Sequence, residues 1–257
     1  MGQLLSCLEM GKGEPLVLLH GFPLDRRMWE AQVAELSSQW RVIAPDLRGF
    51  GQSVSEESFT IELLADDVHH LLASMNAIPC ILGGLSMGGY TALAYVRKYP
   101  ADLRGLILVD TKAAADDPQQ KEGRAKMIEL VRREGARAVA DQMLPRLVAE
   151  EVPRTRPAIA RAVRAMMEAC PAKTIEHALA AMRDRPDRTA ELASISIPSL
   201  IVVGDADVIT PVAVAQSMQM QIPNAMLAVI RGAGHMTPME QPGQVNQTLR
   251  RFVSIVQ

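Results

Sequence analysis

The sequence predicts an α/β fold, in which a mostly parallel, twisted sheet carries helices on both faces. Short apolar segments alternate along the chain with segments of helical character, which is typical of β-α-β units. Residues 84–88 form a glycine-rich turn, Gly-Leu-Ser-Met-Gly, between one such apolar segment and one such helical segment. Strand character disappears between about residues 113 and 195, so we expect a helical cap inserted after the strand that ends at Asp110.

Four elements are expected before residue 50. A short edge strand at 4–9 ends at the glycine-rich residues 11–13. Strands are expected at 16–19 and 41–44, because both segments are short and rich in aliphatic residues. The segment 28–36 between them has apolar residues at helical spacing, which predicts an amphipathic helix.

A helix and a strand precede the glycine-rich turn, and the same two elements follow it. Thr60 can cap a helix that runs over 61–75, with its apolar residues on one face. The strand at 80–83 is wholly apolar, as expected of a strand buried on both faces. The helix at 90–98 ends just before a proline, and another apolar strand follows at 106–110.

The cap and the end of the chain complete the pattern. Six prolines are expected to divide the cap into several short helices: Pro118, Pro145, Pro153, Pro157, Pro171 and Pro186. Strands return at 199–204 and 227–230, and a closing helix is expected at 242–256. The cap follows a strand that ends beside the glycine-rich turn, which favours a lid over a separate helical domain.

Length and composition fit one domain with an insertion. Of the 257 residues, 48% are apolar and only 4% aromatic, so aliphatic side chains and methionines must fill the core. We divide the chain into a first core segment (1–112), the cap (113–195) and a second core segment (196–257). The net charge of −2 gives no reason to expect nucleic acid or a membrane surface as a partner. The sequence leaves the oligomeric state open.

Cysteine usage and the N-terminus bear on location. Cys7, Cys80 and Cys170 are an odd number, widely scattered, so we expect neither a disulfide framework nor a zinc site. The first fifteen residues lack a basic region followed by a long apolar stretch, and we expect no signal peptide. No apolar segment is long enough to span a bilayer. A reducing cytoplasm fits these features best.

Residues 84–88 predict a nucleophile elbow with Ser86 at its tip. A strand that turns into a helix within a few residues needs a tight bend, and the flanking glycines remove Cβ atoms that would clash there. The bend lifts the serine hydroxyl out of the sheet, and the opening helix directs free N–H groups at the group under attack. A glycine-rich turn with an incidental serine is the plain alternative.

Two phosphate-binding motifs are excluded by spacing. A P-loop needs Lys and Ser or Thr after Gly88, where this chain has Gly89 and Tyr90. A dinucleotide fingerprint needs glycines at positions i, i+2 and i+5, which no register here supplies.

His235 is the expected general base, because histidine is the side chain best matched to taking a serine proton at neutral pH. His69 and His70 lie mid-helix beside two aspartates, which indicates a solvated helix face rather than a metal site. His177 lies in a polar turn of the cap, and His20 is expected to brace the loop that follows it. His235 follows a glycine-rich loop that can carry an imidazole over the sheet edge.

Asp207 is the carboxylate expected to orient this histidine. Asp205 and Asp207 both follow the strand at 199–204 directly, at its carboxyl end, where sites in open α/β sheets occur. We assign the role to Asp207 and expect Asp205 to cap or brace the turn. Asp110 also ends a strand near the elbow and is the rival candidate. For the oxyanion, the backbone N–H groups of Met87 and Phe22 are the expected donors.

Five segments follow one another in an order that resembles the α/β-hydrolase superfamily: His20–Pro23, Pro45–Gly51, Gly84–Gly89, Gly204–Pro211 and Gly234–His235. Within it, the chain is most similar to small bacterial carboxylesterases, whose relatives include enol-lactonases and cofactor-free haloperoxidase or perhydrolase enzymes. The resemblance implies Ser86, Asp207 and His235 as a catalytic triad, with Phe22 and Met87 as oxyanion donors.

The resemblance has one departure and one exclusion. The family usually begins with two strands before the His-Gly strand, and only 4–9 is available here, so we expect the first strand to be missing. Haloalkane dehalogenases and epoxide hydrolases of this fold carry Asp at the elbow, and Ser86 argues against both.

These features predict a cytoplasmic serine esterase that hydrolyses short-chain esters with water and needs no metal or cofactor. The rivals on the same fold are an enol-lactonase, a perhydrolase or haloperoxidase, and a C–C bond hydrolase. The rival from another class is a non-catalytic ligand receptor. Several methionines are candidates for an apolar substrate pocket, although packing of the helices is the plain alternative: Met127, Met143, Met166, Met167, Met182 and Met236.

Overall fold

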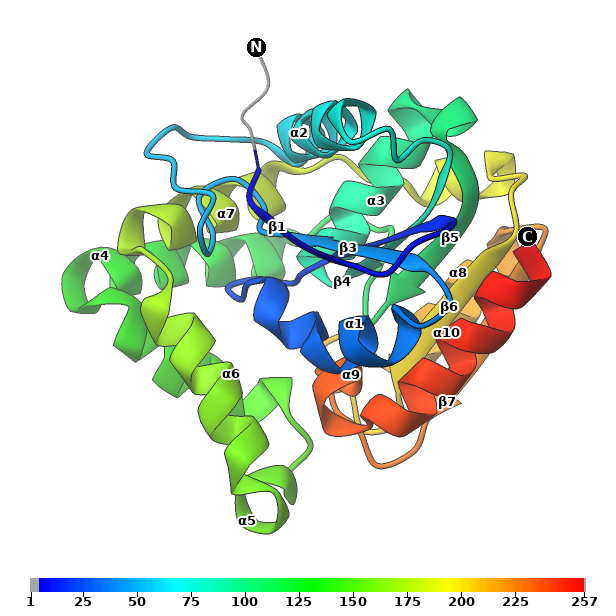
Figure 1. Cartoon of the computed structure of the whole chain (residues 1–257). Coiled ribbons are helices and arrows are strands. Elements are labelled where there is room, and N and C mark those ends of the chain that lie inside the picture. The colour runs from blue at the N-terminus through cyan, green and yellow to red at the C-terminus, as the bar shows by residue number, and fades with distance from the viewer. Residues whose placement is uncertain (1–4, 257) are drawn as a thin grey trace.

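The computed structural model describes residues 5–256, and a seven-stranded sheet forms its centre (Figure 1). The strands lie in the order β1-β3-β2-β4-β5-β6-β7. Only β1 is antiparallel to its neighbour. Their bounds are β1 Cys7–Met10, β2 Pro15–Leu19, β3 Arg41–Pro45, β4 Cys80–Leu85, β5 Leu103–Val109, β6 Ser199–Gly204 and β7 Ala225–Ile230. Because β2 to β7 are parallel, their carboxyl ends meet at one edge, where loops gather functional side chains.

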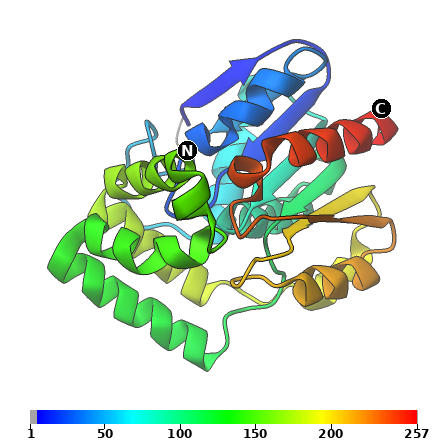
Figure 2. The same ribbon diagram turned by 90° about the horizontal axis from the view of Figure 1, so that it is seen from below.

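The core has two layers, one on each face of the sheet, because successive side chains of a strand point to opposite faces. Val17 packs with α2, α3 and α8 on one face, whereas Leu18 packs with α1 and α10 on the other. Figure 2 shows α10 (red) and α1 (blue) together on the same side of the sheet. These helices are α1 Glu30–Leu36, α2 Ile61–Ser74, α3 Met87–Lys98, α8 Val212–Gln221 and α10 Pro242–Val256. The predicted α/β fold is confirmed.

Helices fill the chain between β5 and β6 and form a body beside the sheet (Figure 1). They are α4 Pro118–Leu147, α5 Val152–Thr155, α6 Pro157–Ala169, α7 Ala172–Asp184 and the 3-10 helix η3 Thr189–Ser194. This helical segment contacts loops of the core: Thr174 Oγ1 donates to Gly49 O at 2.9 Å, and His235 N donates to Leu147 O at 2.9 Å. The cap therefore lies against the loop that carries His235.

The prediction that prolines divide the whole cap into short helices was wrong for α4. Pro145 lies inside this 30-residue helix, close to its end. The helix bends instead at Gly135, whose φ of 79° and ψ of −175° are not helical. A positive φ is accessible to glycine at little cost, so the bend falls at the glycine. Pro118 and Pro157 open α4 and α6, where a missing N–H costs nothing.

Most other expected elements are present, with shifted ends. The Thr60 side chain accepts a hydrogen bond from Leu63 N and caps α2, as predicted. The helix expected at 28–36 is divided into a 3-10 turn, η1 Arg26–Trp29, followed by α1. Two helices were not predicted, α8 and the four-residue α9 Thr237–Glu240.

The first strand, β1, lies at the edge of the sheet, and within residues 5–256 it is the one strand that precedes β2. Residue 4, which the sequence assigned to this strand, lies outside the described residues. Between residues 5 and 256, no helix combines the length and the apolar character needed to cross a bilayer.

Candidate active site

Ser86 occupies the junction between β4 and α3 with a strained backbone, φ 53° and ψ −111°. Two glycines are required by the close packing of the turn. A Cβ atom on Gly84 would lie 2.1 Å from Gly88 O, and one on Gly88 would lie 2.4 Å from Leu19 O. The turn is further held by Thr111, whose Oγ1 donates to Ser86 O at 2.8 Å. A non-glycine residue with this backbone, fixed by its surroundings, is typical of a functional position.

Asp207 and His235 form a buried hydrogen-bonded pair at the carboxyl edge of the sheet. Asp207 follows β6 and His235 follows β7, and the Asp207 Oδ2 to His235 Nδ1 distance is 2.8 Å. Nδ1 faces a carboxylate and therefore carries the proton, so the lone pair of the ring is on Nε2. This tautomer is the one that a general base needs.

The Asp207 carboxylate accepts further hydrogen bonds from the turn that follows it. Oδ1 accepts from Ile209 N at 2.7 Å and Thr210 N at 3.0 Å, and Oδ2 accepts from Thr210 Oγ1 at 2.6 Å. Burial alone raises the pKa of Asp207, but the charge and hydrogen bond of His235 and the bonds from Thr210 outweigh it and lower the pKa to about 2. Asp207 is therefore ionised at neutral pH.

The pKa of His235 is set by two opposed effects. Complete burial lowers the pKa of the imidazole, because a charged ring loses its hydration. The charge of Asp207 and its hydrogen bond more than reverse this, so the pKa of His235 is raised above its usual value of 6.5. An imidazole with a raised pKa is a stronger base once it is deprotonated.

The loop that carries His235 is tied to the cap through the carboxylate of Glu240. Glu240 Oε1 accepts from Gly234 N at 3.0 Å and Met236 N at 3.1 Å, which flank the histidine. Glu240 Oε2 accepts from Ala149 N of the cap at 2.9 Å. The predicted glycine-rich loop is thus held at both sides of His235.

The two rival acids make different contacts. Asp205 Oδ1 accepts from Gly232 N at 2.8 Å, so it braces the loop that leads to the histidine instead of the turn after β6 that the sequence predicted. Asp110 is buried, and its oxygens accept from Gly204 N at 3.0 Å and Thr237 Oγ1 at 2.6 Å. Burial raises the pKa of Asp110 well above its usual value. The carboxylate hydrogen-bonded to His235 is therefore that of Asp207.

The loop after β2 lies directly beside Ser86. A Cβ atom on Gly21 would lie 3.4 Å from Ser86 Cβ, so the chain that leads to Phe22 passes the serine at contact distance. Met87 is the first residue of α3, where backbone N–H groups have no partner within the helix. The role of Phe22 and Met87 as oxyanion donors stays a prediction.

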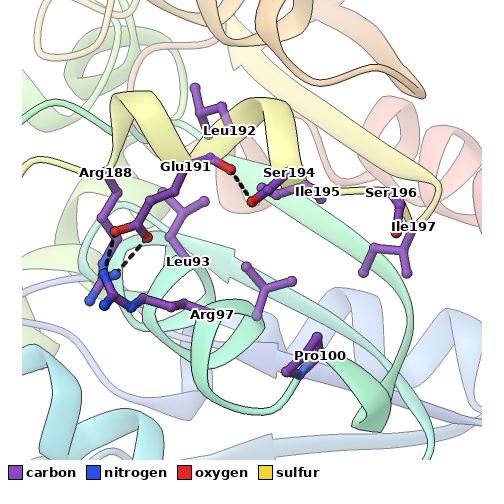
Figure 3. A pocket seen from close by; sticks show the side chains of 11 residues that line it. Leu93, Arg97, Pro100, Arg188, Glu191, Leu192, Ser194, Ile195, Ser196 and Ile197 are labelled. Atoms are coloured by element: carbon purple, nitrogen blue, oxygen red, sulfur yellow. Dashed lines mark hydrogen bonds and ion pairs between the residues drawn. The ribbon is translucent and has the colours of Figure 1, made fainter.

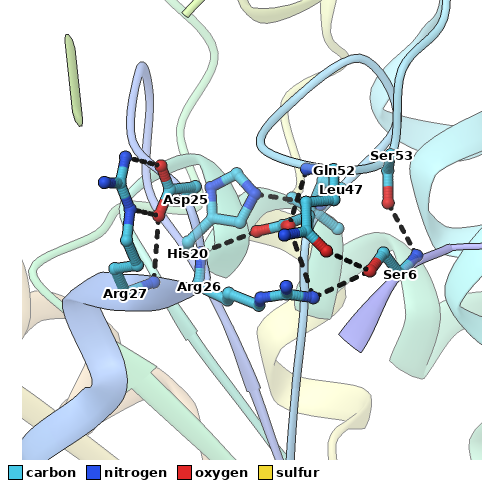
Figure 4. A network of polar contacts seen from close by, with 9 residues as sticks. Ser6, His20, Asp25, Arg26, Arg27, Leu47, Gln52 and Ser53 are labelled. Carbon is cyan, nitrogen blue, oxygen red and sulfur yellow. Dashed lines mark hydrogen bonds and ion pairs between the residues drawn. The ribbon is translucent and has the colours of Figure 1, made fainter. Parts of the chain in front are cut away.

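His20 is occupied at both ring nitrogens. Nε2 accepts from Leu47 N at 2.9 Å, and Nδ1, which therefore carries the proton, lies 3.0 Å from Gly21 O (Figure 4). Burial lowers the pKa of His20 and favours its neutral form. His20 thus links the loop after β2 to the loop after β3, which agrees with the predicted bracing role.

The remaining histidines lie on α2 and α7. His69 Nδ1 lies 2.8 Å from Asp102 Oδ2 and its ring stacks on Tyr99, and His70 is exposed. The placement of His177 in an exposed polar turn was wrong, because α7 begins soon after Pro171 and carries His177 half-buried within it.

A cavity of about 550 Å³ lies between the cap and the core, against the acid–base pair. Ile209 and Thr210, which bind the Asp207 carboxylate, form part of its wall, and Tyr90 in the first turn of α3 forms another part. The lining side chains come from both components: Tyr90, Lys112, Asp116, Asp117, Gln119, Gln120, Gly123, Arg124, Met127, Gln142, Met143, Arg146, Leu179, Ile209 and Thr210.

Of the methionines proposed for a substrate pocket, Met127 and Met143 line this cavity. Met166 lines a separate cavity of about 280 Å³ next to Arg26 and Cys170. The other three are buried in the two core layers: Met167, Met182 and Met236.

A further cavity of about 310 Å³ lies between α3 and η3 (Figure 3). Pro100 and Ile197 in its wall precede β5 and β6, so it lies at the amino ends of the strands, away from Ser86. Arg97 and Arg188 both pair with Glu191 at its mouth.

Two contributors to the site were not found from the sequence. Thr210 belongs to the segment that resembles the family, but nothing in the pattern showed that its hydroxyl would reach Asp207. Glu240 lies only five residues after His235, and a lone carboxylate just before a predicted helix is expected to be exposed to solvent. Its burial arises from the cap, whose position no local pattern reveals.

Comparison with known proteins gives a consistent result. A family model described as alpha/beta hydrolase fold matches residues 14–242. The AB hydrolase superfamily protein YisY of Bacillus subtilis is 32% identical, over 95% of this chain and 93% of its own. The 3-oxoadipate enol-lactonase 1 of Acinetobacter baylyi is also 32% identical, over 94% of this chain and 89% of its own.

Solved structures agree with these matches. A thermophilic esterase from Thermogutta terrifontis has a TM-score of 0.95 at 44% identity, covering 98% of this chain and 93% of its own. The enol-lactonase from Burkholderia xenovorans has a TM-score of 0.90 at 26% identity, covering 97% of this chain and 96% of its own.

Proposed function

This chain belongs to the α/β hydrolase fold family, and from that premise we propose that it is a serine carboxylesterase acting on short-chain esters. Ser86 is the nucleophile, His235 the general base, and Asp207 the carboxylate that orients the base. The observation that carries the proposal is the buried Asp207–His235 hydrogen bond of 2.8 Å at the sheet edge where the strained Ser86 also lies. The esterase structure that is 44% identical supports the same reaction.

The reaction proceeds in two half-reactions with one proton carrier. Ser86 Oγ attacks the ester carbonyl while His235 Nε2 takes its proton, and the oxyanion is stabilised by the N–H groups of Phe22 and Met87. His235 then gives the proton to the departing alcohol as the C–O bond breaks, which leaves an acyl-enzyme. A water molecule attacks the acyl carbon with His235 again as base, and the free acid leaves. No step needs a cofactor.

Turnover of p-nitrophenyl acetate and p-nitrophenyl butyrate tests this proposal. We expect steady-state hydrolysis by the wild-type protein and a loss of at least about a thousandfold in Ser86→Ala, since the nucleophile is removed. Activity of Ser86→Ala within tenfold of wild type would assign the chemistry to another residue. Absence of turnover with all short-chain esters would favour a ligand receptor on this fold.

A second candidate function is that of an enol-lactonase, whose substrate is an intramolecular ester that the same residues would hydrolyse. The observation that favours it is the 32% identity to the 3-oxoadipate enol-lactonase 1 of Acinetobacter baylyi, over nearly the full length of both chains. Values of kcat/KM for an enol-lactone and for a linear ester of equal carbon number distinguish the two. We expect the linear ester to be the better substrate.

We also propose that the protein works in the cytoplasm. The support is that its three cysteines, Cys7, Cys80 and Cys170, are free thiols, which a reducing compartment maintains. Fractionation of the native host with an antibody against the chain tests this location.

A further inference from the structure

The cavity beside the acid–base pair is lined by both halves of α4. The bend at Gly135 turns the second half of the helix back. Figure 2 shows the two halves in green, one on each side of the bend. Arg124 and Met127 enter the wall from the first half, and Met143 and Arg146 from the second. A straight helix would bring only one of its halves to the cavity. Both halves of α4 therefore contribute to the wall of this cavity, which adjoins the acid–base pair through Thr210.

One buried carboxylate in this wall is surrounded by three cations. Asp116 Oδ1 lies 3.1 Å from Lys112 Nζ and 2.9 Å from Arg185 Nη1, and Asp116 Oδ2 lies 2.9 Å from Arg124 Nε. Burial alone raises the pKa of Asp116, but Arg124 and Arg185 outweigh it and lower the pKa to about 2. The carboxylate is therefore ionised, and it balances one of the three positive charges.

A second acid in the wall offsets a further positive charge. Asp117 is exposed, and its Oδ1 accepts from Gln120 N at 2.8 Å as the N-cap of α4. A carboxylate at this position interacts with the positive end of the helix dipole. Among the lining residues, Lys112 and Arg124 therefore offset Asp116 and Asp117, whereas the third cation, Arg185, is buried outside the lining and interacts with Asp187.

Arg146 adds a fourth cation, and it has no partner among the residues that the structure describes. Its guanidinium lines the cavity from the second half of α4, and within residues 5–256 it makes no hydrogen bond or ion pair. By contrast, Arg124 in the first half is held by Asp116. A guanidinium with five free donors at the wall of a substrate cavity is suited to bidentate binding of a carboxylate.

We propose that the preferred substrate is an ester that carries a carboxylate remote from the scissile bond, and that Arg146 binds this carboxylate. The inference rests on the proposed function, since it describes the acyl side of the same esterase site. Because Lys112 and Arg124 offset the charges of Asp116 and Asp117, the lining keeps a net positive charge that comes from Arg146. Met127 and Met143 contact the methylene groups between the two carboxyl functions.

Two esters of equal size test the substrate class. The p-nitrophenyl monoester of a six-carbon dicarboxylic acid is compared with the same ester whose free acid is replaced by a primary amide. A six-carbon chain is used because shorter diacid monoesters cyclise to anhydrides without an enzyme. We expect kcat/KM of the wild-type protein to be about ten- to a hundredfold higher for the acid, from one charge-assisted contact at a partly hydrated site.

Arg146→Gln tests the residue, and the readout is the ratio of kcat/KM for acid and amide. We expect this ratio to fall to within about threefold of unity, and Arg146→Lys to retain part of it, because a lysine keeps the charge but not the fork of donors. Arg137→Gln is the matched control. Arg137 is an exposed arginine in the same half of α4, outside the cavity lining, and its removal changes the net charge equally.

Raising the salt concentration from about 20 mM to 0.5 M should also reduce the ratio in the wild-type protein, because screening weakens a partly exposed charge contact. Equal rates for acid and amide, or a preference for the amide, would overturn the inference while leaving the esterase proposal intact. A preference that is unchanged in Arg146→Gln, or equally reduced in Arg137→Gln, would overturn the role of Arg146. Failure to hydrolyse either ester would instead contradict the proposed function.

Discussion

At the scale of single residues, Ser86, the proposed nucleophile, has a backbone conformation that its side chain disfavours. Its φ of 53° and ψ of −111° are the mirror image of an ordinary extended conformation, so glycine adopts them freely whereas serine and alanine do not. Its side chain makes no capping hydrogen bond to α3. The strain is thus uncompensated by the local helix and is held by the packing of the glycine turn.

This strain leads to a prediction on stability. Ser86→Ala should leave the free energy of unfolding close to wild type, because the Cβ atom and the strain both remain. The free energy of unfolding of Ser86→Gly should be about 1–2 kcal/mol higher than that of Ser86→Ala. Glycine relieves about 1–3 kcal/mol of backbone strain, and this gain exceeds the conformational entropy that glycine loses on folding. Urea unfolding of the two inactive variants measures the difference. If Ser86→Gly were the less stable of the two, the backbone would carry no strain.

The choice of Asp207 as the acid leads to a comparison of three variants. Asp207→Asn should lower kcat by about four orders of magnitude, because an amide favours the wrong imidazole tautomer. Asp205→Asn and Asp110→Asn should each cost less than about tenfold, since their oxygens bind backbone and hydroxyl donors instead of His235. Activity is measured with p-nitrophenyl butyrate at saturation. If Asp110→Asn were inactive while Asp207→Asn stayed active, the acid would be Asp110, which follows β5 instead of β6.

The pH dependence follows from the pair formed by Asp207 and His235. The protonated imidazole cannot accept the proton of Ser86, so kcat/KM should rise with pH as His235 loses its proton. The raised pKa of His235 places the midpoint of this rise above 6.5. In Asp207→Asn the attraction of this carboxylate is lost, and the pKa-lowering effect of burial is opposed only by the smaller effects of Asp110 and Glu240, so the midpoint of the residual activity should move to lower pH. A midpoint unchanged by this substitution would show that Asp207 does not act on the base.

The sequence singled out Ser86 and His235 as candidates but not every residue that surrounds them. Ser86 stands in a glycine pattern with a steric reason, and His235 follows from its glycine-rich loop. Asp205 and Asp207 lie two residues apart in one turn, and only the fold shows which of them points at the imidazole. Glu240 could not be identified, because its three donors come from two separated segments of the chain.

At the scale of elements, α4 shows how two helix-breaking residues differ. Pro145 was the expected end of a helix, and the chain continues through it for two further residues. Gly135, which the sequence analysis did not single out, makes the bend through a positive φ. A glycine within a helical pattern is tolerated or not according to tertiary contacts, so its effect was not predictable from the local sequence.

Two glycines of α4 provide a matched test of this bend. A Cβ atom at Gly135 or at Gly123 meets no other atom within 4 Å, so neither substitution introduces a clash. Gly135→Ala should destabilise the fold by about 1–3 kcal/mol, because alanine resists the positive φ. Gly123→Ala should stabilise it by about 0.5–1 kcal/mol, since it lies in a regular part of the helix. Thermal unfolding of the two variants shows the sign, and a stabilised Gly135→Ala would mean that the bend is not fixed.

At the scale of the whole molecule, the sequence predicted the fold class through the alternation of strands and helices. The sequence did not predict the order of the strands in the sheet. Crossover connections determine which strands are neighbours, and they leave no local sequence pattern. The helix α8 was missed since its sequence mixes valine, methionine and glutamine without a clear apolar face. The cap was located correctly as a helical segment, but its contacts with the His235 loop emerge only in three dimensions.

The substrate range is a property of the assembled molecule, since the cavity of about 550 Å³ is shared by cap and core. Its apolar wall comes from side chains such as Met127, Met143 and Ile209, whereas Lys112 and Arg146 make the rest of the wall polar.

Each added methylene of an acyl chain contributes up to about 0.8 kcal/mol to binding while it contacts apolar wall, and then costs free energy. We therefore expect kcat/KM for neutral p-nitrophenyl esters to peak between about two and six acyl carbons and to fall steeply beyond about eight, by the same filling argument. A series of rising chain length, measured below the micellar concentration, gives this profile. A preference for chains of about twelve carbons or more would contradict it, because such chains must find an apolar channel that this polar wall does not provide.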